Sequence, residues 1–193
     1  MTVTLSRLAA FALVLLATPR VALAIGQTTY VETTPGGGTF PLVQTGVAAR
    51  FVVDPADWPG VTRAAEDLQA DVNRVTGITP QLVAAPPVTG DIVVIGTIGR
   101  SPLIDRLVRE RKIDVSGVTG KWESFVVQTI ASPFPGVTRA VVIAGSDKRG
   151  TIFGIYDLSE QIGVSPWYWW QDVTPEKKPA LFIKPGRSFT SLI

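Results

Sequence analysis

Ile92-Val93-Val94-Ile95 is a continuous run of β-branched residues, and the turn Gly96-Thr97-Ile98-Gly99 separates it from Ser101-Pro102. A strand with apolar residues on both faces is typical of the interior of an α/β sheet, which helices cover from both sides. Serine followed by proline favours a helix start, because the serine side chain caps the first turn and proline fits the first helical position. The stretch therefore predicts a buried strand followed by a helix that ends near Arg109.

An amphipathic pattern precedes this strand. From residue 58 to residue 75, apolar side chains recur at spacings of three and four, with charged residues between them, which predicts a helix entered through Asp54-Pro55. Gly77 follows where a left-handed helix cap is expected. Upstream, Phe40–Val43 and Arg50–Val53 are predicted to form two short strands around a turn at Gly46. The apolar stripe of the helix comprises Trp58, Val61, Ala65, Leu68, Val72 and Val75.

The C-terminal half contains two further β patterns, Phe125–Ile130 and Ala140–Ala144. The proline- and glycine-rich segment between them is too short for a crossover, so antiparallel pairing is expected. A third helix is predicted to follow, capped by Ser146 or Asp147 and ended by Gly163. The residues that point inward from this helix are expected to be Ile152, Ile155, Tyr156 and Ile162.

Leu181–Ile183 completes the pattern as an expected edge strand, because prolines flank it. Strands and helices alternate without an internal repeat, so the sequence predicts the α/β class, with a mixed β-sheet packed with helices in a single domain.

The first 24 residues are predicted to lie outside this fold. Arg7 precedes the ten apolar residues of Leu8–Ala17, and Ala22-Leu23-Ala24 has the small-x-small pattern of a signal-peptidase site. A membrane anchor needs about 20 apolar residues, so a cleaved export signal and a periplasmic or secreted protein are expected. We divide the rest into a flexible, glycine-rich segment at 25–39, an α/β domain at 40–187 and a short tail at 188–193.

The composition excludes several kinds of chemistry. There is no histidine and no cysteine, which rules out a Ser-His-Asp triad, a cysteine nucleophile, the usual zinc sites and disulfides. The 18 basic residues include Arg7 and Arg20 of the predicted leader, so the remaining chain balances its 16 acidic residues. A neutral domain lacks the basic field of a nucleic-acid-binding protein, so no nucleic-acid partner is expected.

Two segments have the position of an anion site. The turn Gly96-Thr97-Ile98-Gly99 lies between a strand and a helix, but it has neither the dinucleotide-binding glycine spacing nor a P-loop lysine. Lys148 and Arg149 open a helix, where the helix dipole disfavours positive charge. Either a carboxylate of the protein or of a ligand contacts these cations, or Asp147 offsets them.

Trp167-Tyr168-Trp169-Trp170 is the least ordinary stretch, with three of the five tryptophans. If the stretch is extended, its side chains alternate between two faces, and both faces need cover. Indole rings bury large apolar areas and keep a polar N–H, which suits protein interfaces and stacking on sugars. A structural plug of the domain, an interface with another domain and a sugar-binding surface are the three interpretations.

Carboxylates are the only candidates for acid–base catalysis, because histidine is missing. A glycosidase needs two of them about 5 to 9.5 Å apart, and no spacing in the sequence marks such a pair. Asp157 and Glu160 are expected to form surface ion pairs on one helix. We assign no catalytic residue, no metal ligand and no cofactor. The carboxylates considered are Glu123, Asp147, Asp157, Glu160 and Asp172.

Three stretches resemble the N-terminal domain of glycoside hydrolase family 115, the xylan α-1,2-glucuronidases. They are Lys121-Trp122-Glu123-Ser124-Phe125, residues 144–159 (AGSDKRGTIFGIYDLS) and residues 161–170 (QIGVSPWYWW), and residues 98–104 (IGRSPLI) are similar to an earlier part of the pattern. The resemblance extends over about Phe40 to Arg187. It implies a non-catalytic, accessory-type domain of an exported enzyme that removes glucuronic or 4-O-methylglucuronic acid from xylan.

The same resemblance implies a partner, because family members continue into a catalytic (β/α)₈ barrel of about 250 residues. No such barrel fits after Arg187, so the chain is expected to be an inactive fragment that self-associates when isolated. The barrel and glucuronoxylan are its expected partners. Lys148, Arg149 and Trp169 match positions near the join to the barrel. They are expected either to border the uronic-acid site or to pack the domain junction. An independent carbohydrate-binding module that uses Trp167–Trp170 is the alternative, and a nucleotide-binding domain that uses Gly96–Gly99 is a weaker one.

Overall fold

The computed structural model describes residues 29–87, 89–171 and 173–190, so the predicted leader lies outside the described residues. Its main feature is a mixed six-stranded sheet with the order β10-β7-β8-β6-β4-β5. The four strands from β8 to β5 are parallel, and β7 and β10 add antiparallel pairs at one side. The strands are β4 (Arg50–Val53), β5 (Leu82–Val83), β6 (Gly90–Thr97), β7 (Phe125–Ala131), β8 (Val137–Gly145) and β10 (Arg187–Thr190).

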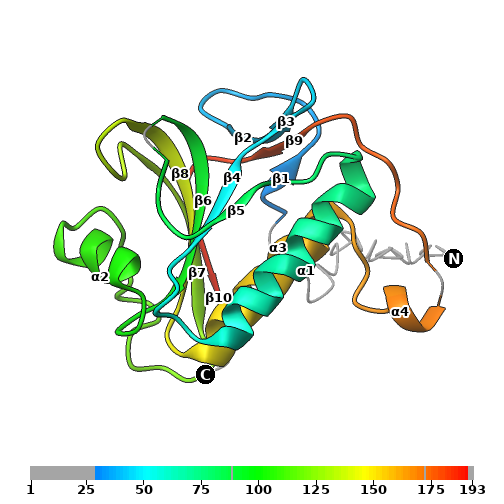
Figure 1. The fold of residues 1–193 in the computed structure, drawn as a ribbon. Coiled ribbons are helices and arrows are strands. Elements are labelled where there is room, and N and C mark those ends of the chain that lie inside the picture. The colour runs from blue at the N-terminus through cyan, green and yellow to red at the C-terminus, as the bar shows by residue number, and fades with distance from the viewer. Residues whose placement is uncertain (1–28, 88, 172, 191–193) are drawn as a thin grey trace, which may run out of the picture.

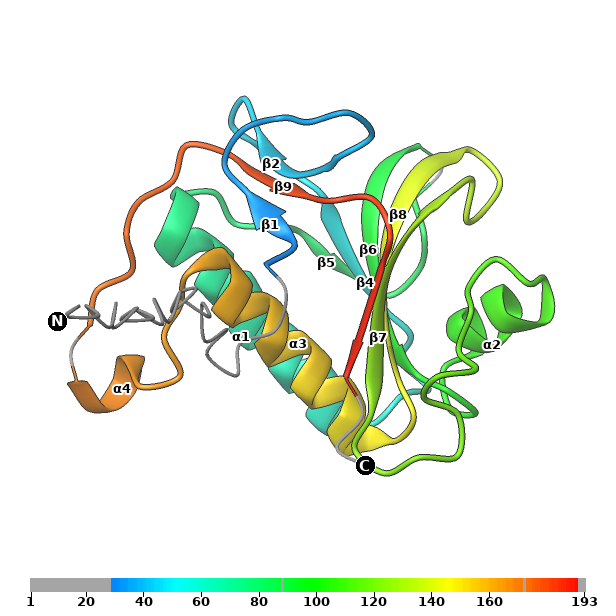
Figure 2. The same cartoon turned by 180° about the vertical axis from the view of Figure 1, so that it is seen from behind.

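Helices cover both faces of this sheet, as the β-branched run of β6 predicts. α1 (Pro59–Thr76) and α3 (Lys148–Ile162) lie side by side on one face, and α2 (Pro102–Arg109) lies on the other (Figures 1 and 2). The side chains of β6 alternate between the two cores: Val93 and Ile95 pack with α1 and α3, whereas Ile92 and Val94 pack with α2. The prediction of an α/β domain with a mixed sheet is confirmed.

The predicted helix boundaries are largely confirmed by their caps. Ser101 caps α2, Asp147 caps α3, and Gly77 and Gly163 end α1 and α3 in the left-handed conformation, with φ of 79° and 108°. The prediction that Trp58 and Tyr156 belong to the buried apolar faces of these helices is wrong. Trp58 precedes α1 as its N-cap and is 41% exposed, and Tyr156 of α3 is 45% exposed.

A second, smaller sheet was not predicted. It has the order β1-β9-β2-β3, with all pairs antiparallel. β9 lies between β1 and β2, so the expectation of an edge strand at Leu181–Ile183 is wrong. The two strands expected around Gly46 also separate: β2 pairs with β3 in the small sheet, and β4 joins the large one. The strands are β1 (Val31–Glu32), β2 (Phe40–Gln44), β3 (Val47–Ala48) and β9 (Leu181–Ile183).

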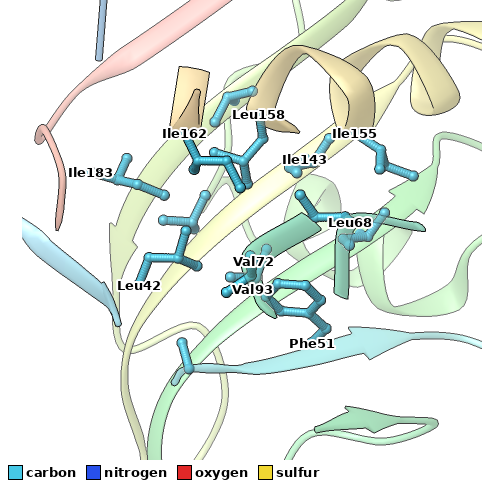
Figure 3. Close-up of a cluster of buried hydrophobic side chains, with 14 of the residues drawn as sticks. Leu42, Phe51, Leu68, Val72, Val93, Ile143, Ile155, Leu158, Ile162 and Ile183 are labelled. Carbon is cyan, nitrogen blue, oxygen red and sulfur yellow. The ribbon is translucent and has the colours of Figure 1, made fainter. Parts of the chain in front are cut away.

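The small sheet covers the core at the C-terminal ends of α1 and α3. Leu42 of β2 and Ile183 of β9 lie in one buried cluster with Val72 of α1 and Ile162 of α3 (Figure 3). β1 lies within the segment 25–39, and β10 continues the large sheet beyond residue 187. The structured part of the chain therefore extends past both limits of the predicted 40–187 domain. Within the described residues, no helix is long and apolar enough to cross a membrane.

Candidate functional site

The glycine turn after β6 is a packing feature. Gly96 is close to α2, because a Cβ atom there would lie 2.6 Å from the Ser101 side chain. The amides of the turn all have acceptors on the protein. Thr97 N donates to Asp57 Oδ2 (2.6 Å), Ile98 N to the Gly145 carbonyl (2.9 Å) and Gly99 N to Asp105 Oδ1 (2.8 Å). These amides are therefore not available to a phosphate group.

Asp57 has a position that the sequence does not reveal. The chain leaves β4 toward β5 and leaves β6 toward β7 and β8, so the sheet order reverses between β4 and β6, where doubly wound folds commonly bind ligands. Here the buried Asp57 carboxylate accepts hydrogen bonds from Thr97 N and from Trp58 N (2.7 Å). At this point of the sheet, Asp57 therefore has the role of a structural carboxylate.

Of the two cations at the start of α3, Arg149 has a carboxylate partner within the protein. Arg149 Nη1 lies 2.7 Å from Glu123 Oε1, and the guanidinium also lies 5.6 Å from the Phe153 ring centre. Asp147 is occupied by two amides, those of Gly150 (2.7 Å) and Glu123 (2.9 Å). The carboxylate partner expected for a cation at this helix start is therefore Glu123 of the protein itself.

Lys148 differs from its neighbour. Its side chain is exposed, and its Cδ lies 3.9 Å from the Cβ position of Gly60, at the start of α1. Among the described residues, no ion pair or hydrogen bond to Lys148 Nζ is seen. Lys148 is thus an uncompensated cation at the end of the molecule where α1 and α3 both begin.

A short loop next to Lys148 presents Trp122 to solvent, with 83% of its surface exposed. Glu123 has φ of 52°, an uncommon conformation for a residue with a side chain. The amide of Ser124 donates to Ser146 Oγ (3.1 Å), and Gly150 packs directly on the Ser124 carbonyl. The backbone of the loop next to Trp122 is therefore held on the start of α3.

A groove of about 630 Å³ lies farther along α3. It extends from Glu123 and Phe125, near the start of α3, to α4 (Tyr168–Gln171). Most of the aromatic stretch belongs to this short helix. The alternation of side chains between two faces, which we expected for an extended stretch, therefore does not apply. Trp167 and Trp170 are 59% and 83% exposed. The lining also includes Phe153, Tyr156, Asp157, Glu160, Val164 and Tyr168.

The three predicted site residues do not form one site. Arg74 near the end of α1 lies over the Tyr168 ring at 5.1 Å, which places α4 beside the C-terminal ends of α1 and α3. Lys148 and Arg149 lie at the opposite end of α3, about 20 Å away by the rise of the helix. α4, which carries Trp169, therefore lies at the other end of α3 from the two cations.

Asp157 contradicts the expectation of a surface ion pair. It is 8% exposed and accepts a hydrogen bond from the Tyr30 hydroxyl (2.7 Å). Burial raises the pKa of Asp157 to about 6; the hydrogen bond from Tyr30 opposes this shift, and the nearby charge of Glu160 adds to it. Burial and the Asp157 charge also raise the pKa of Tyr30. Tyr30 N donates to Gln161 Oε1 (3.1 Å), so the N-terminal strand is anchored on α3.

Three of the candidate carboxylates, Glu123, Asp157 and Glu160, line the groove, and most of the candidates have a partner within the protein. Glu123 is paired with Arg149, Asp147 accepts two amides and Asp157 accepts the Tyr30 hydroxyl. Asp172 lies outside the described residues. No group of three or more acidic residues within the described ranges is arranged to hold a metal ion.

Sequence reasoning missed the exposure of Trp122 and Trp58 and the buried hydrogen bond of Tyr30. Trp122 was noted only as part of a motif, because an isolated tryptophan in a loop gives no sign of its exposure. The contact between Tyr30 and Asp157 joins residues 127 positions apart, which no local pattern reveals.

Fold and site together define a small mixed α/β domain with a groove along α3. No protein-family model matches the chain, and no curated protein matches it. A solved structure does: the chain is similar to the N-terminal part of BtGH115A, described as a family GH115 4-O-methyl-α-glucuronidase with specificity for decorated arabinogalactans. The TM-score is 0.64, with 31% sequence identity over 77% of this chain and 18% of that chain. The resemblance to family 115 is confirmed, and the chain spans about a fifth of the matched enzyme.

Two further structures are similar at lower identity. The family GH20 β-N-acetylhexosaminidase of Streptomyces coelicolor A3(2) has 13% identity and a TM-score of 0.46, over 84% of this chain and 25% of that chain. CpGH84D has 12% identity and a TM-score of 0.43, over 71% and 20% of the two chains. At these values the similarity carries no argument about function.

Proposed function

We propose that this chain is the N-terminal accessory domain of a glycoside hydrolase of the family 115 type, and that it supports a catalytic domain without hydrolysing glycosides itself. The observation that carries the proposal is the match to the N-terminal part of BtGH115A at 31% identity over 77% of the chain. The matched enzyme is described as specific for decorated arabinogalactans. Both xylan and arabinogalactan are therefore candidate polysaccharides for the enzyme to which this chain belongs.

The groove along α3 is the surface that we assign to the catalytic domain. Its apolar lining is formed by Phe125, Phe153, Val164 and Tyr168. Trp167 and Trp170, which are close to Tyr168 in the chain, are exposed. Exposed apolar surface of this kind marks interaction sites in soluble proteins. Trp169, on α4, is accordingly proposed as a junction residue.

Of the two cations at the start of α3, Lys148 is the better candidate for contact with a uronic-acid carboxylate. Arg149 already has the Glu123 carboxylate at 2.7 Å, and a ligand would have to compete with that pair. Lysine binds carboxylates as a flexible point charge and needs no preset geometry. We therefore propose that Arg149 stabilises the loop at Glu123 and that Lys148 is open to a ligand.

The purified chain is expected to release no 4-O-methylglucuronic acid from glucuronoxylan or from decorated arabinogalactan. Release above a blank would overturn the proposal. Its positive part is tested by adding the chain to BtGH115A from which the matching N-terminal part has been deleted. A complex in gel filtration, with regained activity, is the expected result, and W167A/W170A is expected to weaken the complex. A well-folded deletion enzyme that is fully active and ignores the added chain would contradict the supporting role.

An independent carbohydrate-binding module is the second candidate, because Trp167 and Trp170 expose much of their rings. Titration of the chain with neutral xylan and arabinogalactan oligosaccharides tests it. Binding that W170A abolishes would favour the module over the docking role.

We also propose that the protein is exported, on the basis of the leader pattern at 1–24. A mature N-terminus at Ile25 in protein isolated from the periplasm or the medium is the expected finding, and an intact Met1 in cytoplasmic protein would contradict it.

A further inference from the structure

A second aromatic surface lies at the end of the molecule where α1, α2 and α3 begin, a helix length away from α4 (Figures 1 and 2). We call it the Trp58–Trp122 edge. It consists of Trp58, Arg100, Lys121, Trp122 and Lys148, all of which are exposed. The groove that we assign to a catalytic domain is not lined by any of these residues.

Contacts within the domain connect the members of this edge. Arg100 lies over the Trp58 ring, 4.6 Å from its centre. Lys148 reaches Gly60, two residues after Trp58. On the other side, the residue after Trp122 donates its amide to the Asp147 cap of α3, directly before Lys148. The chain segments that carry Trp58 and Trp122 therefore both lie next to the start of α3, where Lys148 is located.

Three of the five residues of the edge are cations. Of the carboxylates nearby, Glu123 pairs with Arg149, and Asp57, Asp105 and Asp147 accept hydrogen bonds from backbone amides. In contrast, no ion pair to Arg100, Lys121 or Lys148 is seen within residues 29–87, 89–171 and 173–190. A partner that complements this surface must be an anion that also offers apolar faces to the indoles.

We propose that the Trp58–Trp122 edge binds an anionic polysaccharide, in which sugar rings stack on the indoles and carboxylates contact Lys148, Lys121 and Arg100. Indole rings combine a broad apolar face with a polar N–H, which suits a sugar ring, and ammonium and guanidinium groups form charge-assisted hydrogen bonds with carboxylates. The binding surface is preformed, because Arg100 already lies on Trp58 and the loop of Trp122 is held by α3, so little conformational entropy is lost.

A polysaccharide fits better than a nucleic acid or a protein. The similarity to a carbohydrate-active enzyme places sugars near this chain. The acidic residues balance the basic ones outside the predicted leader, so the broad basic field that nucleic-acid binding requires is missing. The inference goes beyond the accessory role, since it concerns binding by this chain whether or not a catalytic domain is attached.

The test is calorimetric titration of the complete chain with an oligogalacturonate, at low and at high salt. Neutral xylohexaose and an oligo-dT of similar length serve as the comparison ligands. We expect oligogalacturonate to bind, more weakly at high salt, and both comparison ligands to bind at least about tenfold more weakly. W122A and K148E are each expected to lower the affinity about tenfold.

Two variants control for general effects. Val47 of β3 is 69% exposed and lies in the small sheet, and Lys177 lies near the far end of α1, where its Nζ donates to the Arg74 carbonyl. V47A and K177E are expected to change the affinity less than about twofold. Circular dichroism and the melting temperature of each variant verify that it is folded.

Each other outcome overturns the proposal. Absence of oligogalacturonate binding removes it, as does an equal loss in K177E and K148E. Equal binding of xylohexaose shows that the cations have no part, and tighter binding of oligo-dT assigns the edge to nucleic acid. None of these results affects the complementation test with BtGH115A, so failure of the edge and failure of the accessory role are separable.

Discussion

A single buried carboxyl shows how residue-level chemistry controls this fold. Asp157 lies among apolar side chains, and its partner is the hydroxyl of Tyr30 at 2.7 Å. Because its pKa is raised above the ordinary value of 3.8 to about 6, the folded state binds a proton more tightly than the unfolded chain. The stabilisation from protonated Asp157 is present below pH 3.8 and is lost as the pH rises through about 6.

The variant D157N tests this at the residue scale. Wild-type protein is expected to lose unfolding free energy relative to D157N as the pH rises from about 4 to about 7, measured by urea unfolding at several pH values. Y30F is the companion variant. The hydrogen bond from Tyr30 lowers the pKa of Asp157, so its removal is expected to shift this loss to higher pH. A constant difference between wild type and D157N across the range would show that Asp157 does not titrate in it.

At the scale of elements, the contact of α3 with the loop before β7 depends on a glycine. A Cβ atom at Gly150 would overlap the Ser124 carbonyl oxygen and approach the Ser124 amide, both of which belong to backbone that the Asp147 cap and Ser146 hold in place. Neither side of this contact is able to move independently.

We therefore expect G150A to reverse the usual benefit of alanine in a helix. It should lower the free energy of unfolding by about 2 kcal/mol or more, because backbone has to shift. Gly60 offers a matched control in the first turn of α1, where an added Cβ would make an ordinary contact at 3.6 Å with Ile152. G60A is expected to leave the stability unchanged or raise it by up to about 1 kcal/mol. Equal effects of the two variants in urea unfolding would contradict this account.

Elements with local signals are the ones that sequence reasoning finds. The β-branched run of β6, the periodicity of α1 and the caps at Ser101, Asp147 and Gly163 all act within a few residues, and the structure confirms them. The second sheet could not be found in this way. β2 pairs with β9, which lies about 140 residues later in the chain, so the turn at Gly46 suggested the wrong partner.

The candidate site was less accessible to sequence reasoning than the fold. Lys148 and Arg149 were found because cations at a helix start are unusual, but the sequence cannot show that Glu123 pairs with only one of them. The aromatic run gave no period that distinguishes a strand from a helix, and it is a short helix. Exposure of Trp122 depends on a loop conformation with positive φ at Glu123, which has no glycine to mark it.

At the scale of the whole molecule, the exposed rings of Trp167 and Trp170 are expected to cause self-association of the isolated chain. The apparent mass in light scattering should rise with protein concentration, and the double variant W167S/W170S should scatter as a monomer. W122S is the control, because its ring is equally exposed to solvent but lies at the opposite end of α3. A wild-type chain that stays monomeric at every concentration would contradict the assignment of this surface to a protein neighbour.

The carboxylate of Asp57 has a consequence for any ligand that this architecture accepts. Between β4 and β6 it supplies, from within the chain, the acceptor for two backbone amides. An anionic cofactor placed there would find these donors already used. Recruitment of such chemistry would first require replacement of this one aspartate.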